Sequence, residues 1–197
     1  MARKGGSHSS VYRREGDAWL IEIRLRELRQ LFHHLDPAPF REKDLDPAAE
    51  TYIEDAMREI GPRQTVKLLV YLPEAARPTE EEEARTLPDA VAHYFGYRAA
   101  QTRVELRRLL RRALANLAVG LAFLGLCLWL RKALAAGGGA EVLGEGLLII
   151  GWVALWRPVE MFLYDWWPVL RRAWRFEAIA RMPIEVRGAA AGDAPLA

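Results

Sequence analysis

Two apolar runs decide the fold of this chain: Ala113–Leu130 (ALANLAVGLAFLGLCLWL) and Leu147–Trp156 (LLIIGWVALW). The first run has Asn116 as its only polar residue. A helix over this run rises about 27 Å, close to the hydrocarbon thickness of a bilayer. The second run is extended by apolar residues on both sides. Together the two runs predict a membrane-spanning helical hairpin, which assigns the chain to the class of α-helical membrane proteins.

The rest of the composition sets limits on function. The chain has 197 residues and a formal net charge of +2, which gives no case for nucleic-acid binding. The only cysteine, Cys127, falls inside the first run, so an intramolecular disulfide and a thiolate zinc site are excluded. The first thirty residues or so lack the apolar core of a signal peptide, so we expect the N-terminal domain to stay in the cytoplasm.

The sequence before the hairpin predicts a small cytoplasmic α/β domain. Alternating apolar residues predict strands at Trp19–Leu25 and Thr65–Leu72. Helical periodicity predicts a short helix at Leu28–Leu35 and a longer one at Ala49–Ile60. Two strands joined through a helix are expected to be parallel neighbours. Ile184–Arg187 alternates too, so the domain has two or three strands and two or three helices.

Together these patterns divide the chain into nine segments. They are a disordered tail (1–17), the cytoplasmic α/β domain with an acidic linker (18–87), a juxtamembrane basic helix (88–112) opened by Pro88, the first transmembrane helix (113–134), an extracytoplasmic loop (135–141), the second transmembrane helix (142–163), an interfacial aromatic and basic helix (164–181), a candidate third strand (182–187) and a second disordered tail (188–197).

Basic residues gather on the outer sides of the hairpin. The positive-inside bias therefore places both termini in the cytoplasm and the short loop outside. The Ala-, Arg- and Leu-rich usage is typical of a bacterium with a GC-rich genome, so we expect the bacterial inner membrane. Seven arginines are expected to contact anionic lipid headgroups of the cytoplasmic leaflet, with a specific acidic protein or nucleic-acid partner as the alternative: Arg103, Arg107, Arg108, Arg111, Arg112, Arg171 and Arg172.

Small residues recur on one face of each predicted span. Such stripes let helix backbones approach closely in lipid. They either face each other within one hairpin or turn one face toward another copy, so a homo-oligomer or a larger membrane complex is expected. The stripes are Ala115, Ala118, Ala122 and Gly125 in the first span, and Gly144, Gly151 and Ala154 in the second.

The densest polar chemistry follows the second run. Arg157 and Glu160 are spaced to pair on a helix, and Asp165 is expected to pair with an arginine such as Arg171 or Arg172, or one from the juxtamembrane helix. We call Arg157, Glu160 and Asp165 the charged elbow. Trp156, Trp166 and Trp167 flank it like an interfacial aromatic belt. The elbow is interpreted as a structural anchor, an ion or proton pathway, or a partner surface.

Motifs of common enzymes and cofactor sites are missing from the sequence. There is no phosphate-binding glycine loop, zinc-binding His-Glu helix or nucleophile elbow, so we predict no catalytic residue, metal or cofactor. His33-His34 beside Asp36 is the one metal-like group. Adjacent helical residues point about 100° apart, which makes the histidine pair a poor two-ligand site.

Four pieces of the chain together resemble a family of uncharacterised bacterial two-span inner-membrane proteins. They are LDPAPFREKDLDPAAETYI (35–53), AHYFGYRA (92–99), GWVALWRPVEMFLYDWWP (151–168) and RMPIEVR (181–187), along with the arginine-rich entry to the first span. The resemblance covers most of residues 18–187. It implies a membrane location and carries no activity, substrate or catalytic residue.

Three functions are compatible with these patterns. The leading hypothesis is a non-enzymatic integral membrane protein, an accessory, scaffold or assembly subunit that presents its small domain at the inner membrane. A second is a homo-oligomeric channel or membrane-perturbing unit. A third is a membrane enzyme acting on lipid through Arg157, Glu160 and Asp165.

Overall fold

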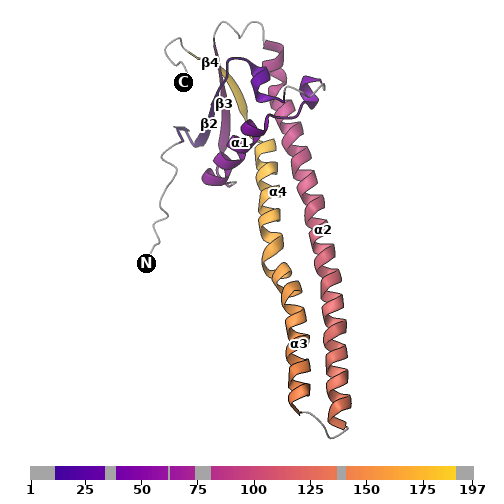
Figure 1. The fold of residues 1–197 in the computed structure, drawn as a ribbon. Helices are drawn as coiled ribbons and strands as arrows, with labels where there is room; N and C mark the ends of the chain where they lie inside the picture. The colour runs from indigo at the N-terminus through magenta and orange to yellow at the C-terminus, as the bar shows by residue number, and fades with distance from the viewer. Residues whose placement is uncertain (1–11, 34–38, 62, 74–80, 137–140, 190–197) are drawn as a thin grey trace, which may run out of the picture. The chain divides into compact units, whose positions relative to one another are not determined.

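The computed structural model describes residues 12–33, 39–61, 63–73, 81–136 and 141–189. They form two compact units, one made of the described residues up to Ala100 and from Ala173 onward, the other of Gln101–Arg172. The structure is mostly helical, with two long apolar helices and one small sheet (Figure 1). Most of both predicted tails, His34 and Asp36, and parts of the predicted linker and loop lie outside the described residues.

The first unit is built on a four-stranded sheet with the order β1-β2-β3-β4. Strands β2 (Ala18–Arg24) and β3 (Val66–Pro73) pair in parallel, as predicted. Strand β4 (Ile184–Ala189) pairs in parallel with the other side of β3. The short alternating segment after the hairpin therefore does join the N-terminal sheet.

The fourth strand, β1 (Arg14–Glu15), lies within the predicted disordered tail of residues 1–17. It corrects both that assignment and the expected count of two or three strands. It pairs antiparallel with β2, with Glu15 opposite Ala18, so that Gly16 and Asp17 form the connecting turn. Gly16 has a φ of 62°, which suits the tight turn of a hairpin. Arg14 and Glu15 are exposed and carry no apolar alternation, so their strand has no hydrophobic signal.

Short helices and α1 connect β2 to β3. The 3₁₀ helices η2 (Leu28–Leu31) and η3 (Phe40–Glu42) precede α1 (Pro47–Ile60). The Asp46 side chain accepts a hydrogen bond from the Ala48 N–H and caps α1, and Pro47 occupies the first turn. Gly61, with a φ of 96°, ends the helix where the sequence predicts it.

Helix α2 (Glu81–Ala136) begins before the predicted start at Pro88, which lies inside it. The preceding segment is rich in glutamate and alanine, which favour helix and suit the positive end of the helix dipole. Leu87, fully buried in the core, anchors the same turn. The helix propensity of this segment and the burial of Leu87 offset the loss of the hydrogen bond that Pro88 removes. From there α2 continues without interruption to Ala136, as the absence of strong breakers predicts.

One face of the sheet carries the core of the first unit. Ile21, Leu68 and Val70 point to this face and are fully buried. Residues of α1, α2 and α4 (Trp166–Ala180) pack against them. From α4 these residues are Phe176 and Ile179, with Phe176 lying 5.9 Å from Phe95 between ring centroids.

This core corrects the prediction of an interfacial helix over 164–181. Within its second half, the apolar face of α4 packs into the protein core and not against a lipid surface. An amphipathic pattern is the same for a helix on a membrane and a helix on a sheet, because each buries one apolar stripe.

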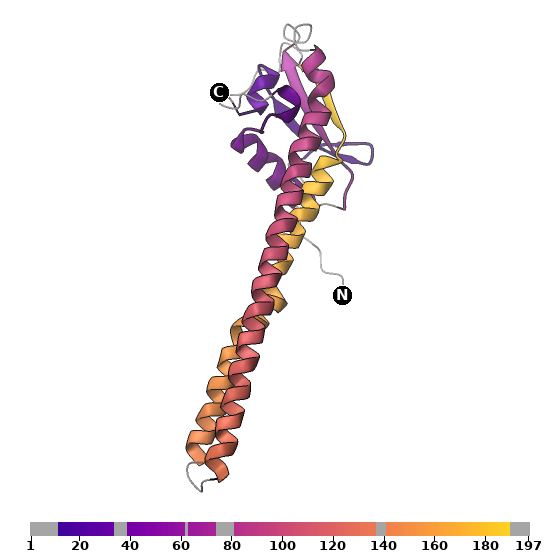
Figure 2. The ribbon, with the colours of Figure 1, turned by 90° about the vertical axis from the view of Figure 1, so that its right-hand side faces the viewer.

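The second unit is a helical hairpin. The C-terminal part of α2 and α3 (Glu141–Glu160) run side by side in both views (Figures 1 and 2). A π-helical turn, η4 (Met161–Asp165), links α3 to α4. Both apolar helices have the length and composition to cross a membrane.

Candidate functional site

The charged elbow lies where the second apolar helix ends. Arg157 Nη1 lies 3.1 Å from Glu160 Oε2 in the last turn of α3, so the pair expected from their spacing is present. Asp165 ends η4 and is partly buried. Among the described residues, its carboxylate makes no hydrogen bond or ion pair. The elbow thus holds one ion pair and one unpaired carboxylate.

The expected pairing of Asp165 with Arg171, Arg172 or an arginine of the juxtamembrane helix is therefore not formed among the described residues. The Arg171 guanidinium lies instead 4.8 Å from the centroid of the Trp167 ring. Arginine on an aromatic face gains a cation–π interaction and keeps its contact with water. The cation–π interaction with Trp167 accounts for the position of Arg171.

The π-turn η4 next to the elbow has its own polar contacts. Trp166 Nε1 donates to the Phe162 carbonyl at 2.7 Å, which satisfies a backbone acceptor within the turn. Across the hairpin, Asn116 Nδ2 lies 3.6 Å from Met161 Sδ. A π-turn is rare and frequently marks a functional position in a helix. The structure therefore places the unpaired Asp165 carboxylate at an irregular point of the helix.

Three tryptophans flank the elbow, and two of them are exposed. Trp156 is 76% exposed, and Trp167 is exposed as well, whereas Trp166 is partly buried. Trp166 and Trp167 contact each other edge to face, with ring centroids 5.5 Å apart. Large aromatic rings left in contact with solvent, beside charged residues, have the amphipathic character of a membrane interface.

The seven arginines expected to contact lipid headgroups are all exposed in the second unit. Arg103 to Arg112 lie along α2 just before the apolar run, and Arg171 and Arg172 lie on α4. Their exposure leaves them accessible to anionic groups. Contact of these arginines with lipid headgroups stays a prediction.

The predicted small-residue stripes meet only in part. Gly144, Gly151 and Ala154 of α3 do face α2. Within the first apolar run of α2, however, the buried residues are Ala113, Gly120 and Cys127, of which Gly120 and Cys127 lie against α3. A Cβ on Gly120 would lie 3.0 Å from the Leu155 side chain, and one on Gly151 would lie 2.7 Å from Leu124 Cδ1. Close packing of the hairpin thus uses Gly120 and Gly151.

The predicted face of the first span is wrong as a hairpin contact. Its four residues, Ala115, Ala118, Ala122 and Gly125, are exposed, and a Cβ on Gly125 would meet nothing within 4 Å. Nearly every position of this run is apolar or small. The sequence pattern therefore fits more than one face, and only the position of α3 selects between them.

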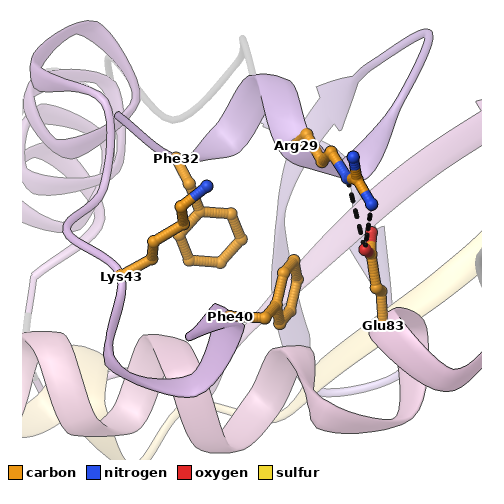
Figure 3. A pocket seen from close by; sticks show the side chains of 5 residues that line it. All are labelled: Arg29, Phe32, Phe40, Lys43 and Glu83. Carbon is orange, nitrogen blue, oxygen red and sulfur yellow. Dashed lines mark hydrogen bonds and ion pairs between the residues drawn. The ribbon is translucent and has the colours of Figure 1, made fainter. Parts of the chain in front are cut away.

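A small cavity lies in the first unit beside η2 and η3 (Figure 3). Its lining includes the Phe32 and Phe40 rings, whose centroids are 4.6 Å apart. Arg29 and Glu83 meet on one side through hydrogen bonds of 3.1 and 3.3 Å, and Lys43 lies on the other. The volume of about 190 Å³ is below the 300 Å³ or so of ordinary ligand pockets. The cavity is large enough for several water molecules or one small molecule.

A charged network covers the sheet face opposite the core. The Arg187 guanidinium donates to Glu185 at 2.7 Å and to Glu15 at 2.9 Å, and Lys67 forms an ion pair with Glu185. The Arg187 guanidinium, together with Lys67, lowers the pKa of Glu185 to about 2. These contacts tie β1, β3 and β4 together. Because Lys67 and Arg187 are balanced by Glu15 and Glu185, the network presents no net charge.

A second network joins the helices on the core side. Glu50 on α1 accepts hydrogen bonds from the Tyr94 hydroxyl at 2.8 Å and from Arg98 Nε at 2.7 Å, both on α2. Burial and the Glu50 carboxylate raise the pKa of the Tyr94 hydroxyl. Arg175 on α4 donates to Glu54 on α1 at 3.1 Å. This arrangement fixes three helices relative to one another.

Sequence reasoning missed both networks. Each pairs residues far apart in the chain, such as Glu15 with Arg187 and Glu54 with Arg175. Polar residues alternating with apolar ones in β3 and β4 were the available signal. Among the described residues, no group of three or more His, Cys, Asp or Glu side chains is arranged to hold a metal ion.

Comparison of the chain with models of protein families, with curated proteins and with solved structures finds no match.

Proposed function

We propose that the chain is an integral membrane protein whose helical hairpin holds a small α/β domain at the membrane surface. The observation that carries the proposal is the exposure of large apolar side chains on both hairpin helices. Val119, Trp129, Ile149 and Trp152 are each between 63% and 70% exposed. Apolar surface this extensive is rare on a soluble monomer and is stabilised by lipid.

The sheet supports a specific topology for this proposal. Strand β4 follows the hairpin in sequence, yet it pairs with β3, which precedes the hairpin. One folded domain thus contains both flanks, which requires both to lie on the same side of the membrane. The flanking arginines favour the cytoplasmic side of a bacterial inner membrane.

The proposed role of the domain is that of a non-enzymatic accessory, scaffold or assembly subunit. Its charged side chains form hydrogen-bonded ion pairs between elements: Glu50 with Arg98, Glu54 with Arg175 and Glu15 with Arg187. Paired charges of this kind hold the elements of the domain together. A rigid domain on a membrane anchor suits the recruitment of protein partners.

Cysteine accessibility tests membrane insertion and topology. In a Cys127→Ser background, single cysteines are placed at residues 13, 138 and 187, and intact cells are treated with a membrane-impermeant thiol reagent. Only the cysteine at 138 is expected to react. Reaction at 13 or 187 reverses or breaks the topology, and extraction of the chain by alkaline carbonate contradicts insertion itself.

Purification in a mild detergent tests the scaffold role. A second protein is expected to co-purify in fixed stoichiometry with the full chain. A matched chain carrying Glu54→Lys, which reverses the charge opposite Arg175, is expected to lose that partner while staying in the membrane. Copies of this chain alone, whatever their number, contradict the scaffold role.

A further inference from the structure

Strand β4 leaves one edge of the sheet unpaired among the described residues. It is the outermost strand, and its backbone hydrogen bonds run to β3. The Leu68 N–H donates to the Pro183 carbonyl at 2.9 Å, so the backbone groups of Pro183 point toward β3. In a parallel ladder, the residues whose backbone groups face the neighbour alternate. The backbone groups of Glu185 and Arg187 therefore point to β3, and those of Ile184, Val186 and Gly188 point outward.

This edge lacks the usual protection against pairing. Natural edges are blunted by short strands, prolines, bulges or uncompensated charges. The opposite edge fits that description, because β1 spans only Arg14–Glu15. Strand β4, in contrast, has six residues, and none of its outward-facing positions is a proline. Its two charges are already neutralised by Lys67 and Glu15.

The sequence of β4 is complementary to itself. Since outward backbone groups occur at alternate residues, an antiparallel partner strand fits only in registers that place an outward residue opposite an outward residue. With Val186 opposite Val186 of a second copy, each Glu185 lies opposite an Arg187. The registers shifted by one step either way place Glu185 opposite Glu185, or Arg187 opposite Arg187. Opposite charges stabilise a cross-strand pair and like charges destabilise it.

We infer that β4 is a dimerisation edge, which pairs antiparallel with β4 of a second copy of this chain and centres on Val186. The contact is isologous, as a two-fold dimer requires. It joins two four-stranded sheets into one continuous sheet. The inference goes beyond the proposed function, because edge pairing does not depend on membrane insertion or on a protein partner.

Proline substitution tests the edge in the full chain in detergent. The Val186 N–H points outward, so Val186→Pro removes an intermolecular hydrogen bond and leaves the ladder to β3 intact. The wild type and the control Val186→Thr are expected to contain two copies of this chain per particle, by light scattering corrected for detergent and for any co-purifying protein. Val186→Pro is expected to reduce the dimer at least about tenfold, with unchanged circular dichroism.

Disulfide trapping tests the register of the two β4 strands. It also tests whether they pair at all, if Val186→Pro fails to fold. Chains with Glu185→Cys and chains with Arg187→Cys, both in a Cys127→Ser background, are mixed and oxidised. Directly opposite residues lie within disulfide reach, whereas residues two positions away lie about 7–8 Å apart and do not. The mixed disulfide is expected to exceed either homodisulfide at least about fivefold.

Three outcomes overturn the inference: a monomeric wild type, a folded Val186→Pro chain that remains a dimer, or homodisulfides that match the mixed one. A monomer also results if another part of the same chain covers the edge. Because alkaline extraction and impermeant labelling report on membrane insertion separately, loss of the dimer is distinguishable from failure of the proposed membrane role.

Discussion

At the residue scale, Glu50 of α1 connects more elements of the domain than its position on an ordinary amphipathic helix indicates. Its side chain is 15% exposed and binds both Tyr94 and Arg98 on α2. The Arg98 guanidinium also lies 5.6 Å from the centroid of Phe176 on α4. One carboxylate therefore positions a cation against the aromatic core that three helices share.

Glu50→Gln is expected to destabilise the α/β unit by about 1.5–3 kcal/mol, because it removes the charge that Arg98 and Tyr94 bind. Hydrogen exchange followed by mass spectrometry measures the effect. Amides of β3 are expected to exchange about 10- to 100-fold faster in the variant. The exposed Glu82→Gln on α2 is the control and should leave exchange unchanged. Equal protection in both variants contradicts the role assigned to Glu50.

Glu185 gives a prediction for pH dependence. Its pKa is lowered from 4.5 to about 2, chiefly by the hydrogen bond from Arg187 and then by Lys67. A lowered pKa in the folded state means that the carboxylate stabilises the fold above about pH 4.5, and that this contribution is lost as the pH falls to about 2. Because Glu185 is 40% exposed, solvent screening keeps the contribution below about 1 kcal/mol.

Carboxyl carbon NMR of the glutamate-labelled chain measures this titration, with Glu185→Gln assigning the signal. The midpoint is expected near pH 2 in the wild type and closer to 4.5 in Arg187→Gln. Lys67→Gln is expected to shift it in the same direction. A midpoint that stays near 4.5 in the wild type shows that the Arg187 contact does not form.

At the scale of the element, the hairpin packs through glycines whose roles are unequal. Gly151 lies against Leu124 and Cys127, whereas Gly125 faces open space. Cys127 is 2% exposed and is a free thiol, so it reports on this contact.

Gly151→Leu is expected to separate α2 from α3, because overpacking a close contact costs about 1–3 kcal/mol. The rate at which a membrane-permeant thiol reagent modifies Cys127 should rise about tenfold or more. Gly125→Leu adds the same bulk on the exposed face of α2 and should leave the rate unchanged. Equal rates in the two variants place the helix contact elsewhere.

Elements with a strong hydrophobic periodicity were predictable from the sequence. Where several faces of a helix are equivalent, the face that contacts the neighbouring helix was not. The alternation in β2 and β3, the stripe of α1 and the uninterrupted run of α2 each report a local preference. In contrast, the first apolar run has small residues on several faces, so Ala118 and Gly120 are equal candidates until α3 is placed. With Pro88 as the expected first residue of the helix, the start of α2 was predicted too late. The helix begins earlier and includes Leu87, whose side chain is buried in the core.

The charged sites show the same limit. The Arg157–Glu160 pair was predictable because both residues lie on one helix at a fixed spacing. The contact of Arg187 with Glu15 was not, since it depends on the order and register of strands from opposite ends of the chain. Asp165 was assigned an arginine partner on proximity in sequence, whereas Arg171 contacts an aromatic ring.

At the scale of the whole molecule, the α/β domain is completed by residues that follow the hairpin. Phe176 and Ile179 of α4 fill its core, and β4 covers the side of β3 that would otherwise be an edge. The hairpin is therefore an insertion into one domain, not a tail attached to it. A membrane chain arranged in this way has an even number of crossings, because its sheet cannot form across a bilayer.

This arrangement makes the domain dependent on the end of the chain. A chain that stops at Arg172 loses Phe176, Ile179 and β4, and burial of each large apolar side chain is worth about 1.5–3 kcal/mol. Small domains are stable by only about 5–15 kcal/mol, so the truncated domain is expected to unfold while the hairpin stays in the membrane. Limited proteolysis of membrane vesicles should cleave residues 12–100 at least about tenfold faster than in the full chain. A chain that stops at Ala189 keeps α4 and β4 and serves as the control, with protection equal to the full chain. Protection that survives truncation at Arg172 contradicts a domain assembled from both flanks, and with it the argument that both flanks lie on one side of the membrane.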